Sequence, residues 1–390
     1  MLLQKENYTI GISNYRIIKM NNTFKQVKLL GETYKISLNN PVCRFNANPV
    51  LTRHNVNTVW QEPHLKVVTV HNAGVTQTKD KTIMLFRSHL RNGISVIGKA
   101  TSQNGLTNWE ISDAPFLKPC AENDTIADSQ NISELIENEG GGVEDPRITC
   151  INDTYYIVYS SYHGSIKDRV RVSLATTKDF KSVVRYGPVL DVDMRNVVLF
   201  SESFSNKYVA LFRPNDNTID QTGGIYSEIK IGYTDTITDN NWQIGNDTII
   251  KQSGGPSAFS AKIGPGAPPL KTKHGWINIF HGVRNTMDGN PYVLGVALHD
   301  LNNPEKVWVS NIPILFPSKD DCKVQDSDYV HVPNVVFTCG AIRNSDGTIY
   351  IYYGGNDTVM NVGISHEDIL AELCVRYPQD PKTGEALYML

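Results

Sequence analysis

Two neighbouring carboxylates stand in a glycine-rich segment of the chain, Gly140-Gly141-Gly142-Val143-Glu144-Asp145-Pro146-Arg147. The three glycines permit a close backbone approach or a positive φ, and Pro146 fixes the geometry of the turn into the next strand. Arg147 could keep one carboxylate ionised or orient it. The segment therefore predicts either an oriented carboxylate or a charged turn with an internal salt bridge.

A second segment, residues 261–269, is rich in glycine and proline and leads into an apolar strand at 275–282. Such a loop can expose backbone N–H groups, and Lys262 adds a cation. The order of residues differs from that of a P-loop. The segment predicts an anion-contacting loop or a structural link between repeated units.

In a third segment, Asp357 follows the strand 351–353 and two glycines. Its carboxylate is a candidate acceptor for a sugar hydroxyl. The alternative is an ordinary Asx turn, which the same residues also favour.

The elements that must position these residues recur along the chain. Five strands end in an aromatic residue, and each is followed by a strand of the type small-x-small, at 98–100, 173–175, 232–234, 295–297 and 363–365. The degenerate period of about 60–75 residues predicts an all-β, five-bladed β-propeller. In it, the small residues would let adjacent sheets approach one another. The alternative is a sandwich of generic hairpins.

The residue after each aromatic occupies an equivalent place in such a fold. Arg87, Arg213 and His281 stand at three of these places. Two arginines and a histidine near a common axis predict a pocket for an anion. The alternative is scattered surface charge.

Composition sets the broad class. The chain has 390 residues, a net charge of -3 and 40% hydrophobic residues, which excludes disordered, collagen-like and coiled-coil proteins. The near-zero net charge argues against nucleic-acid binding, and no apolar run is long enough for a membrane helix. We expect a cytoplasmic protein with six free thiols, because no signal sequence or C-x-x-C pair stands out. Short helices are expected at 133–139 and 367–374.

Taken together, the segments resemble glycoside hydrolase family 130, the inverting β-mannoside phosphorylases and related β-mannosidases. The resemblance runs from about residue 45 to 375 and includes Asn48-Pro49-Val50-Leu51-Thr52, His71-Asn72-Ala73-Gly74, Leu85-Phe86-Arg87, residues 142–147, Leu174-Ala175-Thr176-Thr177, the Lys262 loop, and the stretches 334–337 and 352–358. It implies a five-bladed propeller at 46–375, an N-terminal extension at 1–45 and a tail at 376–390.

The resemblance implies that Asp145 is the catalytic acid. It would protonate the leaving oxygen through the mannosyl 3-hydroxyl while phosphate attacks the anomeric carbon with inversion. The products would be α-mannose 1-phosphate and a shortened glycan, and the reaction would be reversible. Phosphate is already an anionic nucleophile, so no second carboxylate is needed to activate water. No metal or cofactor is expected, and inorganic phosphate is the co-substrate.

Cations that hold phosphate are expected instead. The positions that match phosphate contacts of the family are Arg171, Arg195, Lys262 and His281. Those that match the sugar subsites are Asn72, Arg87, Glu144, Arg147, Arg213 and Asp357. The sequences Thr338-Cys339-Gly340 and, in the Lys262 loop, Gly266-Ala267-Pro268-Pro269 resemble those of the β-1,2-mannoside branch of the family more than those of the β-1,4 branch.

Two other functions remain open. A β-mannosidase of the same fold would use Glu202 or Glu228 as the base for water, and a noncatalytic propeller would only bind glycans. The sequence leaves linkage, acceptor sugar, chain length and assembly into a homo-oligomer undecided.

Overall fold

The computed structural model describes residues 23–214, 227–254, 257–287 and 289–387. These residues form 25 β-strands, three α-helices and two short 3-10 helices, η1 (Pro63–Leu65) and η2 (Lys319–Asp321). The expectation of an all-β protein is therefore confirmed. None of the helices in the described ranges has the length and apolar character needed to span a bilayer.

Most strands fall into five antiparallel groups, here called units 1 to 5, which follow one another along the chain. Units 1 and 2 are joined into one eight-stranded sheet by a parallel bridge between Ser95 and Gly142. Unit 1 contains β4 (His71–Gln77), β5 (Thr82–His89), β6 (Ser95–Ser102) and β7 (Glu110–Ile111). Unit 2 contains β8 (Gly142–Ile151), β9 (Thr154–Tyr162), β10 (Val170–Thr177) and β11 (Val184–Pro188). Unit 3 contains β12 (Met194–Leu199), β13 (Tyr208–Pro214), β14 (Glu228–Thr234), β15 (Gln243–Ile244) and β16 (Ile250–Lys251).

Units 4 and 5 complete the set. Unit 4 contains β17 (Lys262–Pro265), β18 (Leu270–Lys271), β19 (Trp276–Val283), β20 (Tyr292–His299), β21 (Val307–Ser310) and β25 (Pro378–Gln379). Unit 5 contains β22 (Val336–Arg343), β23 (Thr348–Gly355), β24 (Val359–His366) and β3 (Cys43–Arg44). A separate hairpin is formed by β1 (Phe24–Leu29) and β2 (Glu32–Ser37).

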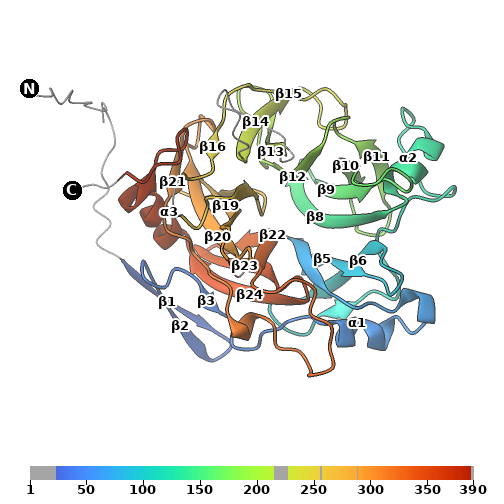
Figure 1. Ribbon diagram of the computed structural model, residues 1–390, viewed down its shortest axis with the longest axis horizontal. Coiled ribbons are helices and arrows are strands. Elements are labelled where there is room, and N and C mark those ends of the chain that lie inside the picture. Colours follow the sequence, from blue (N-terminus) through green and yellow to red (C-terminus); the bar gives the residue numbers. More distant parts are fainter. Residues whose placement is uncertain (1–22, 215–226, 255–256, 288, 388–390) are drawn as a thin grey trace, which may run out of the picture.

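The first and last parts of the chain meet in unit 5. The short strand β3 pairs with β24, so in Figure 1 a blue strand lies beside the red and orange strands. Near the other end, β25 pairs with β21 of unit 4. The predicted N-terminal extension and C-terminal tail thus each contribute a strand to a sheet of the main body.

The hydrophobic core lies between the units rather than within any one of them. Five clusters of buried side chains each combine two units: 1 with 2, 2 with 3, 3 with 4, 4 with 5, and 5 with 1. The opening strands lie against one another in turn, β4 against β8, β8 against β12 and β12 against β17. The opening strand of unit 5, β22, lies against β4 on one side and meets unit 4 through β18, β19 and β20 on the other. Each sheet therefore depends on two neighbours to bury its faces.

The repeated aromatic and small residues form cross-strand pairs within a sheet. Phe86 is the register partner of Gly98, and Phe280 is the partner of Gly295. A Cβ atom added to either glycine would overlap the ring of its partner. The expectation that small residues let adjacent sheets approach is thus corrected for these two glycines, which make room for the ring of the neighbouring strand.

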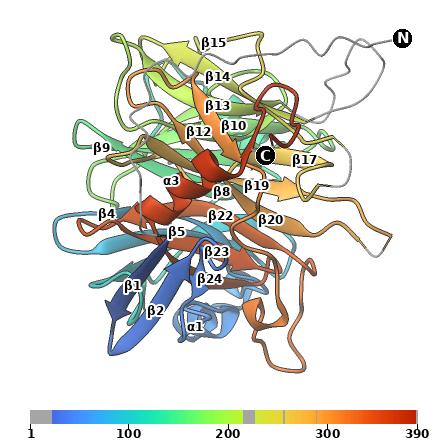
Figure 2. The ribbon, with the colours of Figure 1, turned by 90° about the vertical axis from the view of Figure 1, so that its left-hand side faces the viewer.

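Both expected helices are present, as α2 (Ile132–Glu139) and α3 (Glu367–Arg376). Figure 2 shows α3 lying across strands of units 4 and 5. A further helix, α1 (Arg53–Val59), was not expected from the sequence. Its polar sequence buries only Val56, and a capping box between Thr52 and Asn55 begins it.

We expect Gly98→Ala to destabilise the protein, because the added methyl group must displace the buried Phe86 ring or the strand. Overpacking of this kind costs about 1–3 kcal/mol, which chemical denaturation would measure. Gly254→Ala is the matched control, since nothing lies within 4 Å of a Cβ atom there. Equal stability of the two variants would contradict the proposed role of the aromatic–glycine pair.

Candidate functional site

Three opening strands carry the same backbone irregularity. The register of β4, β8 and β12 shifts at a β-bulge, and each bulge contains a residue with positive φ: Asn72 (47°), Asp145 (50°) and Asn196 (56°). Asn and Asp tolerate this left-handed conformation better than other non-glycine residues. Such bulges re-aim a side chain that a regular strand would direct to one face of the sheet.

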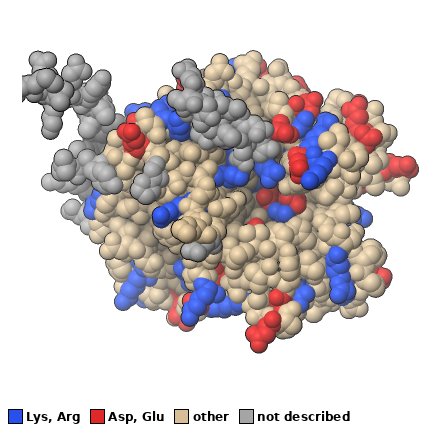
Figure 3. All heavy atoms as spheres, in the orientation of Figure 1, with Lys and Arg blue, Asp and Glu red and all other residues tan. Residues whose placement is uncertain are grey.

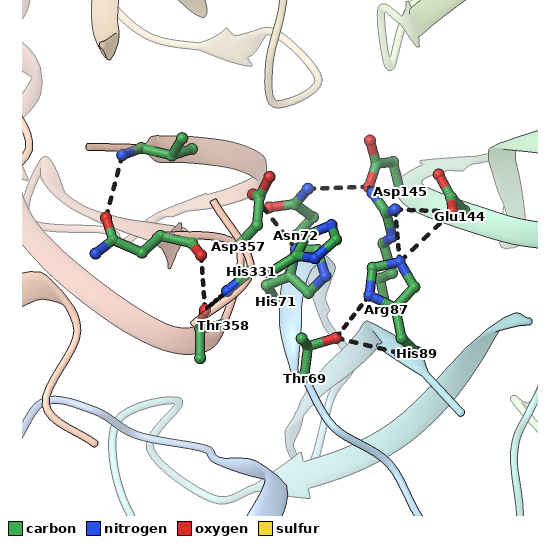
Figure 4. Close-up of polar contacts among 12 residues, drawn as sticks. Thr69, His71, Asn72, Arg87, His89, Glu144, Asp145, His331, Asp357 and Thr358 are labelled. Atoms are coloured by element: carbon green, nitrogen blue, oxygen red, sulfur yellow. Dashed lines mark hydrogen bonds and ion pairs between the residues drawn. The ribbon is translucent and has the colours of Figure 1, made fainter. Parts of the chain in front are cut away.

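The Asp145 carboxylate is held by two residues of unit 1. Asn72 Nδ2 donates to Asp145 Oδ1 over 3.0 Å, and Arg87 NH1 donates to the same oxygen over 3.0 Å. Figure 4 shows the three side chains converging. Among the described residues, no partner hydrogen-bonds to Oδ2. One carboxylate oxygen is thus fixed and the other stays available.

Arg87 also binds the neighbouring carboxylate. Its NH2 group lies 2.7 Å from Glu144 Oε1, which accepts a further hydrogen bond from Ser95 Oγ at 2.5 Å. Burial raises the pKa of Glu144, but the charge of Arg87 and the hydrogen bond from Ser95 outweigh it and lower the pKa to about 2. Glu144 is therefore ionised and balances the charge of Arg87, so Asp145 is not the only counter-ion of the guanidinium.

The contacts of His89 define its tautomer. Arg87 NH2 lies 2.9 Å from His89 Nε2, and a guanidinium can only donate, so Nε2 accepts. The proton then lies on Nδ1, which donates to Thr69 Oγ1 at 3.0 Å. In this tautomer, His89 accepts a hydrogen bond from the same NH2 group of Arg87 that contacts Glu144, and so helps to fix the guanidinium.

Asp357 joins the cluster through a set of imidazoles. Its Oδ1 lies 3.4 Å from His71 Nδ1, and the ring of His331 lies 4.7 Å from that of His89 between centroids. Burial lowers the pKa of His71 despite the opposing effect of Asp357. For Asp357, burial raises the pKa, but His71 and Arg87 lower it overall, so this carboxylate is ionised beside the site.

Arg147 does not contact either carboxylate in the way the sequence suggested. Its NH1 donates to the backbone oxygen of Asp145 over 2.7 Å, and its Nε donates to the backbone oxygen of Gly266 over 3.0 Å. The side chain is almost fully buried, with the guanidinium 5.9 Å from the centre of the Phe337 ring. It ties the Asp145 bulge to the Lys262 loop, and the expected salt bridge is made by Arg87 instead.

A basic group lies on units 3 and 4. Arg213 NH1 donates to Asn196 Oδ1 over 3.0 Å, and Arg213 is the register partner of Arg195. A Cβ atom added to Gly264 would lie 2.6 Å from both Arg213 Cδ and His281 Cε1. The glycine therefore lets these two basic side chains approach the backbone of β17.

His281 is buried within this basic group. Burial first, and then the charges of Arg213, Arg147 and Lys262, holds the pKa of His281 well below its ordinary value. The imidazole is therefore neutral at physiological pH. It can contribute a hydrogen-bond donor to an anion, while the positive charge comes from its neighbours.

Tyr162 stands between the two groups. Burial and the charge of Glu144 raise its pKa to about 12, while Arg195 and Arg87 act in the opposite direction. The Arg195 guanidinium lies 6.0 Å from the centre of its ring. Figure 3 shows acidic and basic side chains close together around the hollowed middle of the face seen in Figure 1.

The other predicted residues have partners elsewhere. Arg171 Nε donates to Asp191 at 2.9 Å, and its NH1 contacts Asp193. Glu202 pairs with Lys271 at 2.5 Å. Glu228, buried on β14, accepts from Thr248 and lies 3.4 Å from Lys230. The structure thus gathers five of the six sugar-subsite candidates around Asp145 and places the sixth, Arg213, in the basic group of units 3 and 4. The two candidate bases of a hydrolase have contacts outside the Asp145 cluster.

Several contributors were not singled out from the sequence. These are Thr69, His89, Ser95, Tyr162, Asn196 and His331. His89 had a usable signal, because residues two apart on a strand share a face with Arg87. Within the described ranges, no group of three or more His, Cys, Asp or Glu residues is arranged to hold a metal ion.

Comparison with known proteins identifies the family. The family model described as beta-1,4-mannooligosaccharide phosphorylase, Glyco_hydro_130, matches residues 41–376. The chain belongs to glycoside hydrolase family 130. The resemblance inferred from the sequence motifs is therefore confirmed.

Three related members of family 130 have names that state both an activity and a linkage. A 1,2-beta-oligomannan phosphorylase of Thermoanaerobacter sp. (strain X514) is 36% identical over 274 residues, 70% of this chain and 78% of the relative. A beta-1,2-mannobiose phosphorylase of the same organism is 35% identical over 70% of this chain and 78% of its own. The solved beta-1,2-mannobiose phosphorylase from Listeria innocua, in complex with beta-1,2-mannobiose, is 26% identical, with a TM-score of 0.69 over 86% of this chain and 99% of its own.

We expect Arg87→Met to destabilise the protein strongly, because it leaves two partly or fully buried carboxylates without their cation. Loss of one partner of a buried ion pair costs about 3–5 kcal/mol. The exposed pair of Arg376 with Glu372 provides the control, since Arg376→Met should cost less than about 1 kcal/mol.

The deficit of Arg87→Met should depend on pH. The pKa of Glu144, about 2 in the folded protein, lies below the ordinary value of about 4.3. Its ionised form therefore stabilises the wild type at neutral pH, and this contribution fades as the pH falls from about 4.3 towards 2. Denaturation at several pH values should show the two proteins converging in that window, and a deficit that grows on acidification would contradict the assignment.

Proposed function

We propose that this protein is an inverting β-mannoside phosphorylase that acts on β-1,2-linked mannooligosaccharides. The observation that carries the proposal is the Asp145 carboxylate, fixed through one oxygen by Asn72 and Arg87 with its other oxygen available. The related 1,2-beta-oligomannan and beta-1,2-mannobiose phosphorylases support the reaction and favour the β-1,2 linkage. The products would be α-mannose 1-phosphate and a glycan one residue shorter.

The five units are proposed to form a five-bladed β-propeller. The support is that five core clusters each join two units and that one of them joins unit 5 to unit 1. The Listeria innocua structure aligns over most of the chain, which is consistent with this architecture. In a propeller, the opening strands of all units lie nearest the axis, where their bulges would deliver side chains to one site.

The roles proposed for the residues follow from the charge distribution. Asp145 would act as general acid, relaying its proton through the mannosyl 3-hydroxyl to the leaving oxygen. Glu144 stays ionised and keeps Arg87 in place. Asn72, Arg87 and Asp357 would contact the mannosyl residue, and Arg213 would contact sugar or phosphate from unit 3. Arg147 would act indirectly, through the backbone of Asp145.

Phosphate would approach from the basic side of the site. Arg195, Lys262 and His281 are the proposed contacts, with Arg171 at the edge, where its guanidinium would have to exchange Asp191 or Asp193 for the anion. Arginine and lysine donors suit phosphate oxygens, and neutral His281 would add an N–H donor. A phosphate dianion held here needs no general base. The hydrolase alternative gains no support from Glu202 or Glu228, which have other partners.

The reaction can be tested with β-1,2-mannobiose, with and without inorganic phosphate. We expect α-mannose 1-phosphate and mannose only when phosphate is present, as detected by phosphorus NMR and sugar chromatography. Release of mannose at the same rate without phosphate would contradict the proposal and favour the hydrolase.

Asp145→Asn separates catalysis from binding in the same assay. Because the amide cannot deliver the proton, kcat should fall by about 10²–10⁴-fold, while mannobiose still binds. Exposed Asp113→Asn is the control and should retain wild-type kcat. Full activity of Asp145→Asn would remove Asp145 from the proposed role.

A further inference from the structure

A cavity of about 420 Å³ lies beside the Asp145 cluster, formed by the start of α1, the loop 323–329 and the start of β24. Its volume falls in the range of roughly 300–1,000 Å³ typical of small-molecule sites. None of the residues assigned so far to acid catalysis or phosphate binding lines it. The proposed acid catalysis and phosphate binding therefore leave this cavity without an assigned ligand.

The cavity walls are held by a nearly buried carboxylate. Asp328 contacts Arg53, accepts from His54 Nε2 at 2.9 Å and accepts from the backbone N–H of Gln325 at 3.1 Å. Its side chain is only 3% exposed. The network ties the loop to α1, so the cavity is already formed without a ligand. It also balances the charge of Arg53, which favours a neutral polar ligand over a strongly charged one.

Tyr329 gives the cavity a sugar-binding character. Its side chain is 49% exposed, although its hydroxyl is held 2.7 Å from His331 Nδ1. A fixed and exposed aromatic ring offers an apolar face for the C–H face of a pyranose. Gln325 and Lys323 in the same wall offer polar groups to its hydroxyls.

Short contacts connect the cavity to the catalytic cluster. The ring of Tyr329 lies 5.7 Å from that of His331, which lies 4.7 Å from His89. Thr358, part of the cavity wall, accepts a hydrogen bond from the His331 backbone N–H at 2.9 Å and follows Asp357 directly. Figure 4 shows this succession from Thr358 through His331 and Asp357 to Asn72 and Asp145. A glycan leaving the cluster on this side would reach the cavity after a short distance.

We propose that this cavity is a distal glycan subsite, which binds a mannosyl residue beyond the two that flank the cleaved bond. The proposal rests on the proposed phosphorylase function and adds a preference for substrates longer than a disaccharide. Tyr329 is its specificity-determining residue, stacking on the sugar, and Gln325 contributes a polar contact.

The test compares β-1,2-mannotriose with β-1,2-mannobiose as phosphorolysis substrates. In Tyr329→Ala the ratio of kcat/KM for the trisaccharide to that for the disaccharide should fall by about 3- to 10-fold relative to wild type, as expected for loss of one aromatic contact. Gln325→Ala should lower the ratio in the same direction. Tyr329→Phe should preserve most of it, since the ring remains. The control is Tyr377→Ala, which removes a partly exposed tyrosine that does not line the cavity and directly precedes β25.

Two outcomes would overturn the subsite. One is an unchanged ratio in both Tyr329→Ala and Gln325→Ala, and the other is an equal loss for both substrates. If the wild type releases no α-mannose 1-phosphate from either sugar, the proposed function fails, and the cavity is judged by calorimetric binding alone. Binding in the Asp145→Asn background should then still favour the trisaccharide, and Tyr329→Ala should remove that preference. Equal affinity for both sugars would overturn the subsite independently of turnover.

Discussion

The Arg87 guanidinium is the interaction on which the candidate site depends. It contacts Glu144 and Asp145 through different nitrogens, and His89 accepts from the nitrogen that contacts Glu144. One fixed cation thus sets the position of the acid candidate, while a neighbouring carboxylate with a lowered pKa balances its charge at neutral pH. Two adjacent carboxylates can then have different roles, because their environments differ although they are neighbours in the sequence.

The backbone contributes as much as the side chains. Asn72, Asp145 and Asn196 occupy bulges in three opening strands, each with a left-handed conformation. A regular strand would alternate its side chains between two sheet faces that are packed against neighbouring units. The bulge redirects one polar side chain per strand, so the interfaces between units remain apolar while polar groups collect at one place.

Sequence motifs predicted which residues belong to the candidate site better than they predicted which atoms those residues contact. The repeated strands, the two longer helices and most positions of the candidate site could be recognised from motifs and from the resemblance to family 130. The expectation that each strand ends at its aromatic residue is wrong, because β5 runs on from Phe86 to His89 and β19 from Phe280 to Val283. The partner of Arg147 could not, because a register shift between Glu144 and Arg147 turns that arginine towards backbone oxygens. Likewise, the pairing of Phe86 with Gly98 depends on strand register, and His331 reaches the site from a loop that has no strand pattern.

In the proposed site, the acid lies on the side of units 1 and 2 and the phosphate-binding group lies on units 3 and 4. A crystal structure grown with saturating inorganic phosphate tests this division most directly. It should show one anion within hydrogen-bond distance of Lys262 and His281, with an arginine from Arg171, Arg195 or Arg213 as a further contact. An empty basic group under those conditions, or phosphate bound only elsewhere on the protein, would contradict the account.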